Sequence, residues 1–346
     1  MKPMATSAKP AASLNEIRAL LRELPGPDLE SGTAAVLRER QLTKPAGALG
    51  RLEELVQWLA TWQAKHPPFI NHPRTAVFAG NHGVAARGVS AYPTAVTAQM
   101  VENFIAGGAA VNQLCAAVDG DLRVYEMALD QPTQDFTEGP AMTDEAAARA
   151  IAYGMMAVEP GVDLLALGEM GIGNSTAAAA LCLGLFGGEA KDWVGPGTGV
   201  EGEALVRKTA AVAEGVAVNK PAMTDPFEVL RTVGGNELAA IVGAILAARL
   251  ARVPVVLDGF ACTAAAAVLY AADRRALDHC VVGHRSPEPG HSRLLEIIGK
   301  QPILDLGMRL GEGSGATLAI QILKGAVACH TGMATFEEAK VSGRSA

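Results

Sequence analysis

One acidic side chain in this sequence lies alone between glycines, where it could act as a general base. Glu312 belongs to the segment LGEGSGA (310–316), just ahead of a stretch with helical character. Flanking glycines leave a carboxylate free to project into a cavity, where the loss of water would raise its pKa toward neutrality. A helix N-terminus would instead favour the ionised form. From these residues alone, Glu312 is either a usable base or simply an acid at the start of a helix.

The segment GEMGIGNST (168–176) has the composition of a phosphate-binding loop. It follows an apolar run and precedes an alanine-rich stretch, which predicts a strand, a loop and a helix. Glycine N–H groups, the helix N-terminus and the hydroxyls of Ser175 and Thr176 could together bind an anion. The segment fits neither the dinucleotide pattern nor the P-loop pattern. A tight turn capped by Asn174 or Ser175 accounts for the same residues equally well.

A second glycine cluster, GPGTG (195–199), precedes Arg207 and Lys208 on a predicted helix. This cluster could bind the other side of a phosphate, with the Lys208 ammonium as a point charge. Taken alone, it is also compatible with an exposed loop and a solvated lysine.

The histidines of this chain invite a metal interpretation that the sequence does not favour. The segment GHRSPEPGH (283–291) contains His284, Glu288 and His291. Its two prolines exclude the helical geometry of an H-E-x-x-H zinc site. We therefore expect a rigid loop in which His291 forms hydrogen bonds, with no metal and no cofactor. His82, which follows the first predicted strand, is by default a core histidine.

The elements that would position these loops alternate between apolar runs and helical stretches. The apolar runs lie at 75–80, 122–129, 162–168, 253–259 and 278–284. Continuous apolar runs separated by helices are typical of a parallel sheet that is covered on both faces. In such a sheet, ligands bind beyond the carboxyl ends of the strands. Two amphipathic helices are predicted ahead of the sheet, at 14–24 and 51–65.

Composition excludes several classes of protein. The chain has 346 residues, of which 49% are hydrophobic and 19% charged, enough for a large core in one or two domains. A net charge of −7 is opposite in sign to the basic surface that nucleic-acid binding needs. No apolar stretch is long enough to span a membrane. The five cysteines form no CxxC pair and we expect them to be reduced. The first residues lack the apolar block of a secretory signal, so we expect a cytoplasmic protein.

Taken together, the segments of the chain resemble the nicotinate-nucleotide:dimethylbenzimidazole phosphoribosyltransferase family in order and spacing. The resemblance covers about residues 40 to 330. Besides the segments above, it rests on TKPAGALGRLE (43–53), FAGNHGVAARGVSAYP (78–93), VGPGTGV (194–200), TVGGNELAA (232–240), PVVLDGFACTAAA (254–266) and GMRLGEGSGA (307–316). It implies transfer of the 5-phosphoribosyl group of nicotinate mononucleotide to 5,6-dimethylbenzimidazole or a related aromatic base. The products would be α-ribazole 5′-phosphate, with inversion at C1′, and nicotinate, in assembly of the nucleotide loop of cobalamin.

The resemblance also implies roles for individual residues. Glu312 would be the general base, and Glu169 would lie near the ribose or the reacting nitrogen. The residues implied to bind the ribose phosphate are Gly171, Gly173, Asn174, Ser175, Gly197, Gly199 and Lys208. Those implied to line the benzimidazole pocket are Ser90, Tyr92 and Gln99.

The fold implied by the resemblance is an α/β fold with a parallel sheet of Rossmann-like topology flanked by helices. Residues 71–324 would form this large domain, and residues 13–70 with 325–346 a small helical domain. Residues 1–12 are expected to be a flexible segment, and the protein is expected to be a homodimer. Two alternatives stay open from the sequence: a nucleotide hydrolase on the same scaffold, and a non-catalytic protein that binds nucleotides or benzimidazoles.

Overall fold

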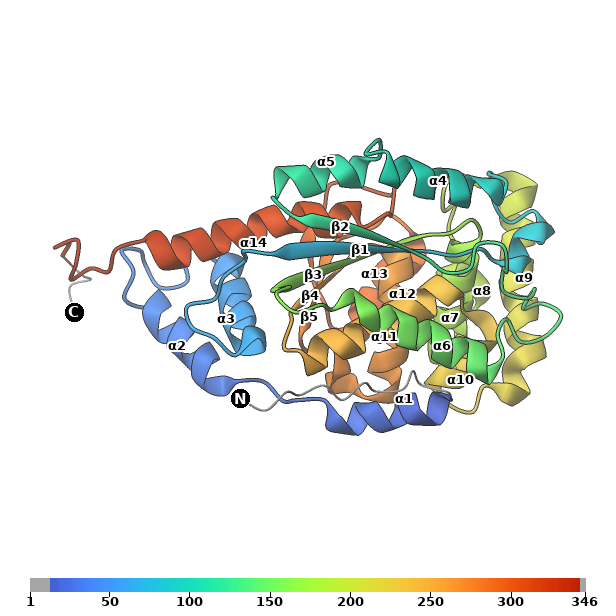
Figure 1. Ribbon diagram of the computed structural model, residues 1–346, viewed down its shortest axis with the longest axis horizontal. Coiled ribbons are helices and arrows are strands. Elements are labelled where there is room, and N and C mark those ends of the chain that lie inside the picture. Colours follow the sequence, from blue (N-terminus) through green and yellow to red (C-terminus); the bar gives the residue numbers. More distant parts are fainter. Residues whose placement is uncertain (1–12, 343–346) are drawn as a thin grey trace.

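The computed structural model describes residues 13–342, built around a six-stranded parallel sheet (Figure 1). The order of the strands is β2-β1-β3-β4-β5-β6. Their bounds are β1 Pro73–Ala79, β2 Asp121–Glu126, β3 Leu164–Met170, β4 Val255–Leu257, β5 Cys280–His284 and β6 Pro302–Leu304. Every neighbouring pair is parallel, which confirms the predicted sheet. The sequence did not predict β6, because this strand has only three residues.

The burial of the strands follows from their composition. All of β1 and the first five residues of β3 are buried, as expected for apolar runs that are covered on both faces. The edge strand β2 is different, because its residues alternate between exposed and half-buried positions. The longest apolar runs therefore lie in the centre of the sheet.

Helices cover both faces of the sheet, as Figure 1 shows. The helices on one face are α4 Ala95–Ile105, α5 Ala110–Ala117 and α14 Ser314–Gly332. On the other face, a single apolar core is shared by α6 Asp144–Gly154, α7 Asn174–Phe186, α8 Ala190–Trp193, α9 Gly202–Asn219, α10 Pro226–Val233, α11 Asn236–Leu250, α12 Phe260–Ala272 and α13 Pro289–Ile298. The helix α11 is buried on all sides, and it packs closely on α6 because a side chain at Gly154 would collide with the backbone of Ala240.

The chain begins with three helices, α1 Leu14–Leu20, α2 Leu29–Glu39 and α3 Arg51–Gln63. The helices α2 and α3 pack with the C-terminal half of α14. By contrast, α1 packs on α6, with Leu14 and Ile17 in the main core. The division into a large and a small domain therefore stays a prediction, and the expected flexible segment 1–12 lies outside the described residues.

The helix boundaries differ from the expectations in two places. The helix α3 ends two residues early because Ala64 adopts a left-handed conformation with φ 51°. The sequence did not predict α2, whose interior contains Gly32. That glycine is required because a Cβ there would collide with Thr61 of α3. Over residues 13–342, no helix combines the length and the apolar character that crossing a bilayer requires. All five cysteines are free thiols, and four of them are buried.

The N-terminus of α14 lies directly on the carboxyl ends of the central strands. A Cβ at Gly168 of β3 would collide with the backbone nitrogen of Gly313, and a Cβ at Gly315 would collide with the His284 ring at the end of β5. Glycine at these two positions brings the segment that carries Glu312 against the edge of the sheet where ligands bind in this class of fold.

Candidate active site

The loops at the carboxyl edge of the sheet enclose a cavity of about 100 Å³. Its wall is formed by the loop after β3, the start of α12, the loop between β5 and α13, and the segment 309–311 before α14. Five of the residues predicted to bind or act on the substrates line it: Glu169, Gly171, Asn174, Ser175 and Gly197. This cavity is the candidate active site.

Glu169 lies near the end of β3, and three other acids lie close enough to affect its pKa. Asn174 Nδ2 at the start of α7 donates a hydrogen bond to Glu169 Oε2. Burial raises the pKa of Glu169 to about 8, and the carboxylates of Asp258, Glu237 and Glu312 act in the same direction, against the Asn174 hydrogen bond. Glu169 is therefore largely protonated at neutral pH.

Glu312 is buried, with 7% of its surface exposed, and its backbone adopts a left-handed conformation with φ 61°. The backbone N–H of Glu312 donates a hydrogen bond to the carbonyl oxygen of Glu169. Burial raises the pKa of Glu312 to about 7, and the Asp258 carboxylate adds to this effect. Of the two opposing influences that the sequence left open, burial prevails over the helix N-terminus. Glu312 does not itself line the cavity, but the preceding residues Leu310 and Gly311 do.

Asp258, at the end of β4, is an acid whose importance the sequence analysis missed. Its side chain is fully buried and accepts hydrogen bonds from the backbone nitrogens of Gly313 at 3.1 Å and Ala316 at 2.9 Å. Asp258 thereby stabilises the N-terminus of α14 and fixes the backbone next to Glu312. Its Oδ1 also lies 3.4 Å from His284 Nε2. The sequence feature that could have pointed to Asp258 is its position as a single acid between an apolar run and a glycine in VVLDG (255–259).

The predicted phosphate-binding residues converge from three distant parts of the chain. Lys208 on α9 is buried, and its Nζ donates hydrogen bonds to Ser175 Oγ at 2.9 Å and to the carbonyl oxygen of Gly195 at 2.8 Å. The backbone N–H of Gly197 donates a hydrogen bond to Glu288 Oε1 at 2.8 Å. Burial lowers the pKa of Lys208 to about 8, and the Glu288 carboxylate opposes this decrease. The two glycine loops and Lys208 therefore form one unit.

Two further glycines of the predicted phosphate site lie in these loops but do not line the cavity. Gly173 has φ 95° and immediately precedes α7. Gly199 has φ 119° and faces open space. Both adopt a backbone conformation that favours glycine, which explains their residue type without a ligand.

The three residues predicted for the benzimidazole pocket lie outside the cavity lining. Ser90 and Tyr92 lie just before α4, where Ser90 Oγ accepts a hydrogen bond from the backbone N–H of Tyr92. Tyr92 is half exposed, and Gln99 is exposed on α4. The segment is nevertheless attached to the site, because Thr97 Oγ1 accepts a hydrogen bond from the backbone N–H of Ile172, which lines the cavity.

A buried pair near the site joins residues that are distant in the sequence. His82 Nε2 lies 2.7 Å from Glu237 Oε1, and both side chains are fully inaccessible to solvent. The Glu237 carboxylate is one of the groups that raise the pKa of Glu169. The burial of His82 agrees with the expected core histidine, whereas its partner 155 residues later could not be identified from the sequence.

The histidine-rich loop forms hydrogen bonds, as expected. His291 Nδ1 accepts a hydrogen bond from the backbone N–H of Ser286 at 2.9 Å, and Pro289 begins α13. Glu288, considered in the sequence only as a metal ligand, instead lines the cavity. Within residues 13–342, no group of three or more histidine, cysteine or acidic side chains is arranged to hold a metal ion.

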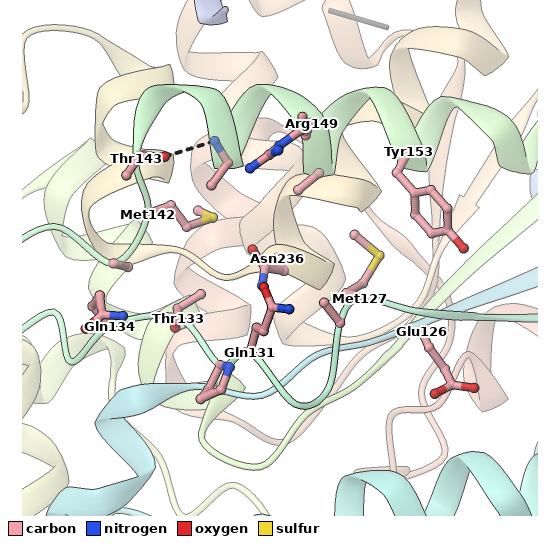
Figure 2. A pocket seen from close by; sticks show the side chains of 15 residues that line it. Glu126, Met127, Gln131, Thr133, Gln134, Met142, Thr143, Arg149, Tyr153 and Asn236 are labelled. Carbon is pink, nitrogen blue, oxygen red and sulfur yellow. Dashed lines mark hydrogen bonds between the residues drawn. The ribbon is translucent and has the colours of Figure 1, made fainter. Parts of the chain in front are cut away.

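A larger pocket of about 570 Å³ lies between the β2–α6 connection, α6 and the start of α11. Figure 2 shows its polar side chains, among them Gln131, Arg149 and Asn236, with Met127 and Met142. None of the predicted site residues lines this pocket. Glu169, whose pKa is raised, lies instead at the smaller cavity.

The comparisons with known proteins agree with each other. A family model described as phosphoribosyltransferase matches residues 24–341. The chain is similar to the nicotinate-nucleotide–dimethylbenzimidazole phosphoribosyltransferase of Brucella anthropi, with 59% identity over 329 residues that cover 95% of this chain and 97% of that protein. It is 60% identical to the protein of the same name from Brucella canis over 328 residues, with the same coverage.

Solved structures give the same result. The crystal structure of nicotinate-nucleotide-dimethylbenzimidazole phosphoribosyltransferase from Thermus thermophilus superposes with a TM-score of 0.84 at 43% identity, over 91% of this chain and 99% of that chain. A crystal structure of CobT from the same organism gives a TM-score of 0.85 at 45% identity, over 90% of this chain and 99% of that one.

Proposed function

Because this chain belongs to the phosphoribosyltransferase family, we propose that it transfers the 5-phosphoribosyl group of nicotinate mononucleotide to 5,6-dimethylbenzimidazole. The products are α-ribazole 5′-phosphate and nicotinate, and the reaction serves the assembly of the nucleotide loop of cobalamin. The observation that carries the proposal is the buried Glu312, whose pKa is raised to about 7 beside the phosphate-binding loops.

The chemistry of the donor requires only one proton-transfer group. In nicotinate mononucleotide the ring nitrogen already bears a positive charge, so nicotinate leaves C1′ with the bonding electron pair and needs no general acid. A glycosidase differs, because its alkoxide leaving group needs a second, protonated carboxyl group. One nitrogen of the benzimidazole attacks C1′ while a base accepts the proton from its other nitrogen. Attack on the face opposite nicotinate converts the β-linkage to α.

Glu312 is the proposed base, since a carboxylate with a pKa of about 7 is a stronger base than an ordinary glutamate yet is still ionised in part of the protein near neutral pH. Glu169, with its pKa raised to about 8, stays largely protonated under the same conditions. The two acids therefore take different roles, Glu312 accepting the proton and Glu169 contacting the ribose or the departing ring.

The phosphate of the donor is proposed to bind between the loop after β3 and the loop at 195–199. Gly171, Gly173, Asn174 and Ser175 would contribute backbone N–H groups and the N-terminus of α7. Gly197 and Gly199 would approach from the other side, and Lys208 would supply positive charge. The hydrogen bond between Lys208 Nζ and Ser175 Oγ supports this arrangement because it ties the two loops together.

The acceptor ring is proposed to bind beside α4, with Ser90, Tyr92 and Gln99 around it. The hydrogen bond between Ile172 and Thr97 supports this placement, since it fixes α4 against the cavity wall. A flat bicyclic ring needs an apolar wall, and Met170, Ile172 and Leu310 provide apolar side chains on the lining of the cavity.

The decisive experiment incubates the protein with nicotinate mononucleotide, with and without 5,6-dimethylbenzimidazole, and detects the ribotide by mass spectrometry. We expect α-ribazole phosphate and nicotinate in equal amounts, and nicotinate release that depends on the acceptor. Equal release without acceptor would instead indicate a nucleotide hydrolase. Binding of both ligands without any release would indicate a non-catalytic binding protein.

We also propose that the protein is a homodimer that acts in the cytoplasm. The dimer is what the resemblance to the family implies. Light scattering of the purified protein gives the number of subunits, and fractionation of cells gives the compartment.

A further inference from the structure

The wall of the cavity contains a positive charge that the mechanism above does not use. Arg309 lines the cavity on the segment before α14. Its side chain is exposed and has no hydrogen bond or ion pair to any other residue in the part of the chain that the structure describes, 13–342. A guanidinium remains charged at every physiological pH and binds carboxylates through two parallel hydrogen bonds. Arg309 is therefore available for an anionic ligand.

The other cations near the cavity already have partners. Lys208 is buried beneath the glycine loops, where Ser175 and the carbonyl oxygen of Gly195 accept its hydrogen bonds. His284 lines the cavity, but its Nε2 lies 3.4 Å from Asp258. An anion in this cavity would thus have Arg309 as a cationic partner that no other residue already occupies.

The backbone places Arg309 close to the reacting groups. A Cβ at Gly311 would lie 2.7 Å from Glu169 Oε1, so the segment is in direct contact with the Glu169 carboxyl group. Two residues of chain span at most about 7 Å between Cα atoms, so Arg309 begins within that distance of Gly311. The side chain of Arg309 lines the same cavity as Glu169.

The same segment is an exposed part of the cavity wall. Arg309 and Leu310 lie between Gly307, with φ 67°, and Gly311, with φ 77°. The cavity of about 100 Å³ is smaller than the roughly 300 Å³ at which small-molecule pockets usually begin. The ribotide therefore requires a displacement of part of the wall, and our proposal includes the exposed segment that carries Arg309 as that part.

The donor carries a negative charge that needs a cationic partner in this cavity. Nicotinate mononucleotide has a ring carboxylate in addition to its phosphate, and two acids of the protein, Glu169 and Glu288, also line the cavity. A carboxylate that loses its water in this cavity without a cationic partner would be strongly disfavoured. We propose that Arg309 binds the ring carboxylate of the nicotinate group, an inference that rests on the proposed function. Arg309 would thereby select nicotinate mononucleotide over nicotinamide mononucleotide.

The experiment compares two donors that differ only at this position. The values of kcat/KM are measured for nicotinate mononucleotide and for nicotinamide mononucleotide with the wild-type protein, Arg309→Gln and Arg285→Gln. Arg285 is the matched control because it is an exposed arginine paired with Asp305 that does not line the cavity. We expect Arg309→Gln to lower kcat/KM for the acid donor by about 10- to 100-fold and to leave the amide donor nearly unchanged. Arg285→Gln should change neither value.

Binding of nicotinate alone, measured by calorimetry, provides a second measurement that does not depend on turnover. We expect Arg309→Gln to weaken nicotinate binding by a similar factor. Equal losses for both donors, or an unchanged affinity for nicotinate, would overturn the assignment of Arg309. Absence of ribotide formation by the wild-type protein with either donor would instead refute the proposed function, and nicotinate binding would then still test Arg309 separately.

Discussion

The backbone N–H of Glu312 donates a hydrogen bond at 3.2 Å to the carbonyl oxygen of Glu169, so the two acids lie on directly connected segments. One segment ends the central strand β3 and the other begins α14. The proximity of Glu312 contributes to the raised pKa of Glu169. Two neighbouring acids with different pKa values can hold one proton between them near neutral pH, which matches a reaction with a single proton acceptor.

Glu312→Gln tests the base directly. The amide preserves size and burial but cannot accept a proton, so we expect turnover to fall at least ~100-fold, the usual scale for loss of a general base. Binding of both substrates should persist. The control is Glu296→Gln, which removes a charge from the exposed surface of α13. Unchanged turnover of Glu312→Gln would remove Glu312 from the mechanism.

Asp258→Asn tests whether a buried charge tunes that base. Asp258 raises the pKa of Glu312, so its neutral replacement should lower this pKa and move the acidic limb of the pH–rate profile from about 7 toward lower pH. The variant also loses one acceptor at the N-terminus of α14, which should cost about 1 kcal/mol of stability in urea unfolding.

A matched control separates the two effects of Asp258→Asn. Asp225 likewise accepts two backbone hydrogen bonds at a helix N-terminus, that of α10, but it is not among the groups that raise the pKa of Glu312. Asp225→Asn should reduce stability without moving the pH–rate profile. If both variants leave the profile in place, Asp258 acts only on folding.

Lys208→Met tests the phosphate site with two substrates. Methionine keeps the length of the buried side chain but removes its charge and its hydrogen bonds to Ser175 and Gly195. We expect kcat/KM for nicotinate mononucleotide to fall about 10- to 100-fold, whereas that for nicotinate riboside, which lacks the phosphate, should change little. The control is Lys300→Met, which removes a lysine bound to two carbonyl oxygens away from the cavity. An equal loss for both substrates would mean that Lys208 only holds the loops in place.

The raised pKa of Glu312 also predicts how stability depends on pH. Its ordinary pKa is 4.5 and its pKa in the folded protein is about 7, so the folded state binds the proton more tightly. The contribution of this group to stability is complete below about pH 4.5 and is lost as the pH rises through about 7, with a total of roughly 3 kcal/mol. The free energy of unfolding, measured in urea between pH 5 and 8, should decrease less with rising pH for Glu312→Gln than for the wild-type protein. Parallel curves for the two proteins would contradict the raised pKa.

Most of the architecture and the order of the loops could be predicted from the amino-acid sequence. Apolar runs such as TAVFAG (75–80) predict buried parallel strands, because in water such runs are stable only between two covered faces. Glycine clusters after these runs indicated the edge of the sheet where the segments that carry Glu169, Ser175 and Glu312 lie. Short or atypical elements, such as β6 and the glycine-containing α2, gave too little periodicity to be recognised.

The electrostatics of the site became visible only in the folded protein. In the sequence, burial and a helix N-terminus opposed each other at Glu312. The fold decides between them by burying the carboxylate and by bringing Asp258, which lies 54 positions earlier, close to it. Likewise, Lys208 meets Ser175, and His82 meets Glu237, only because the sheet brings their loops together. A pKa depends on the water and the charges within a few ångströms in space, and separation along the chain does not reveal either of them.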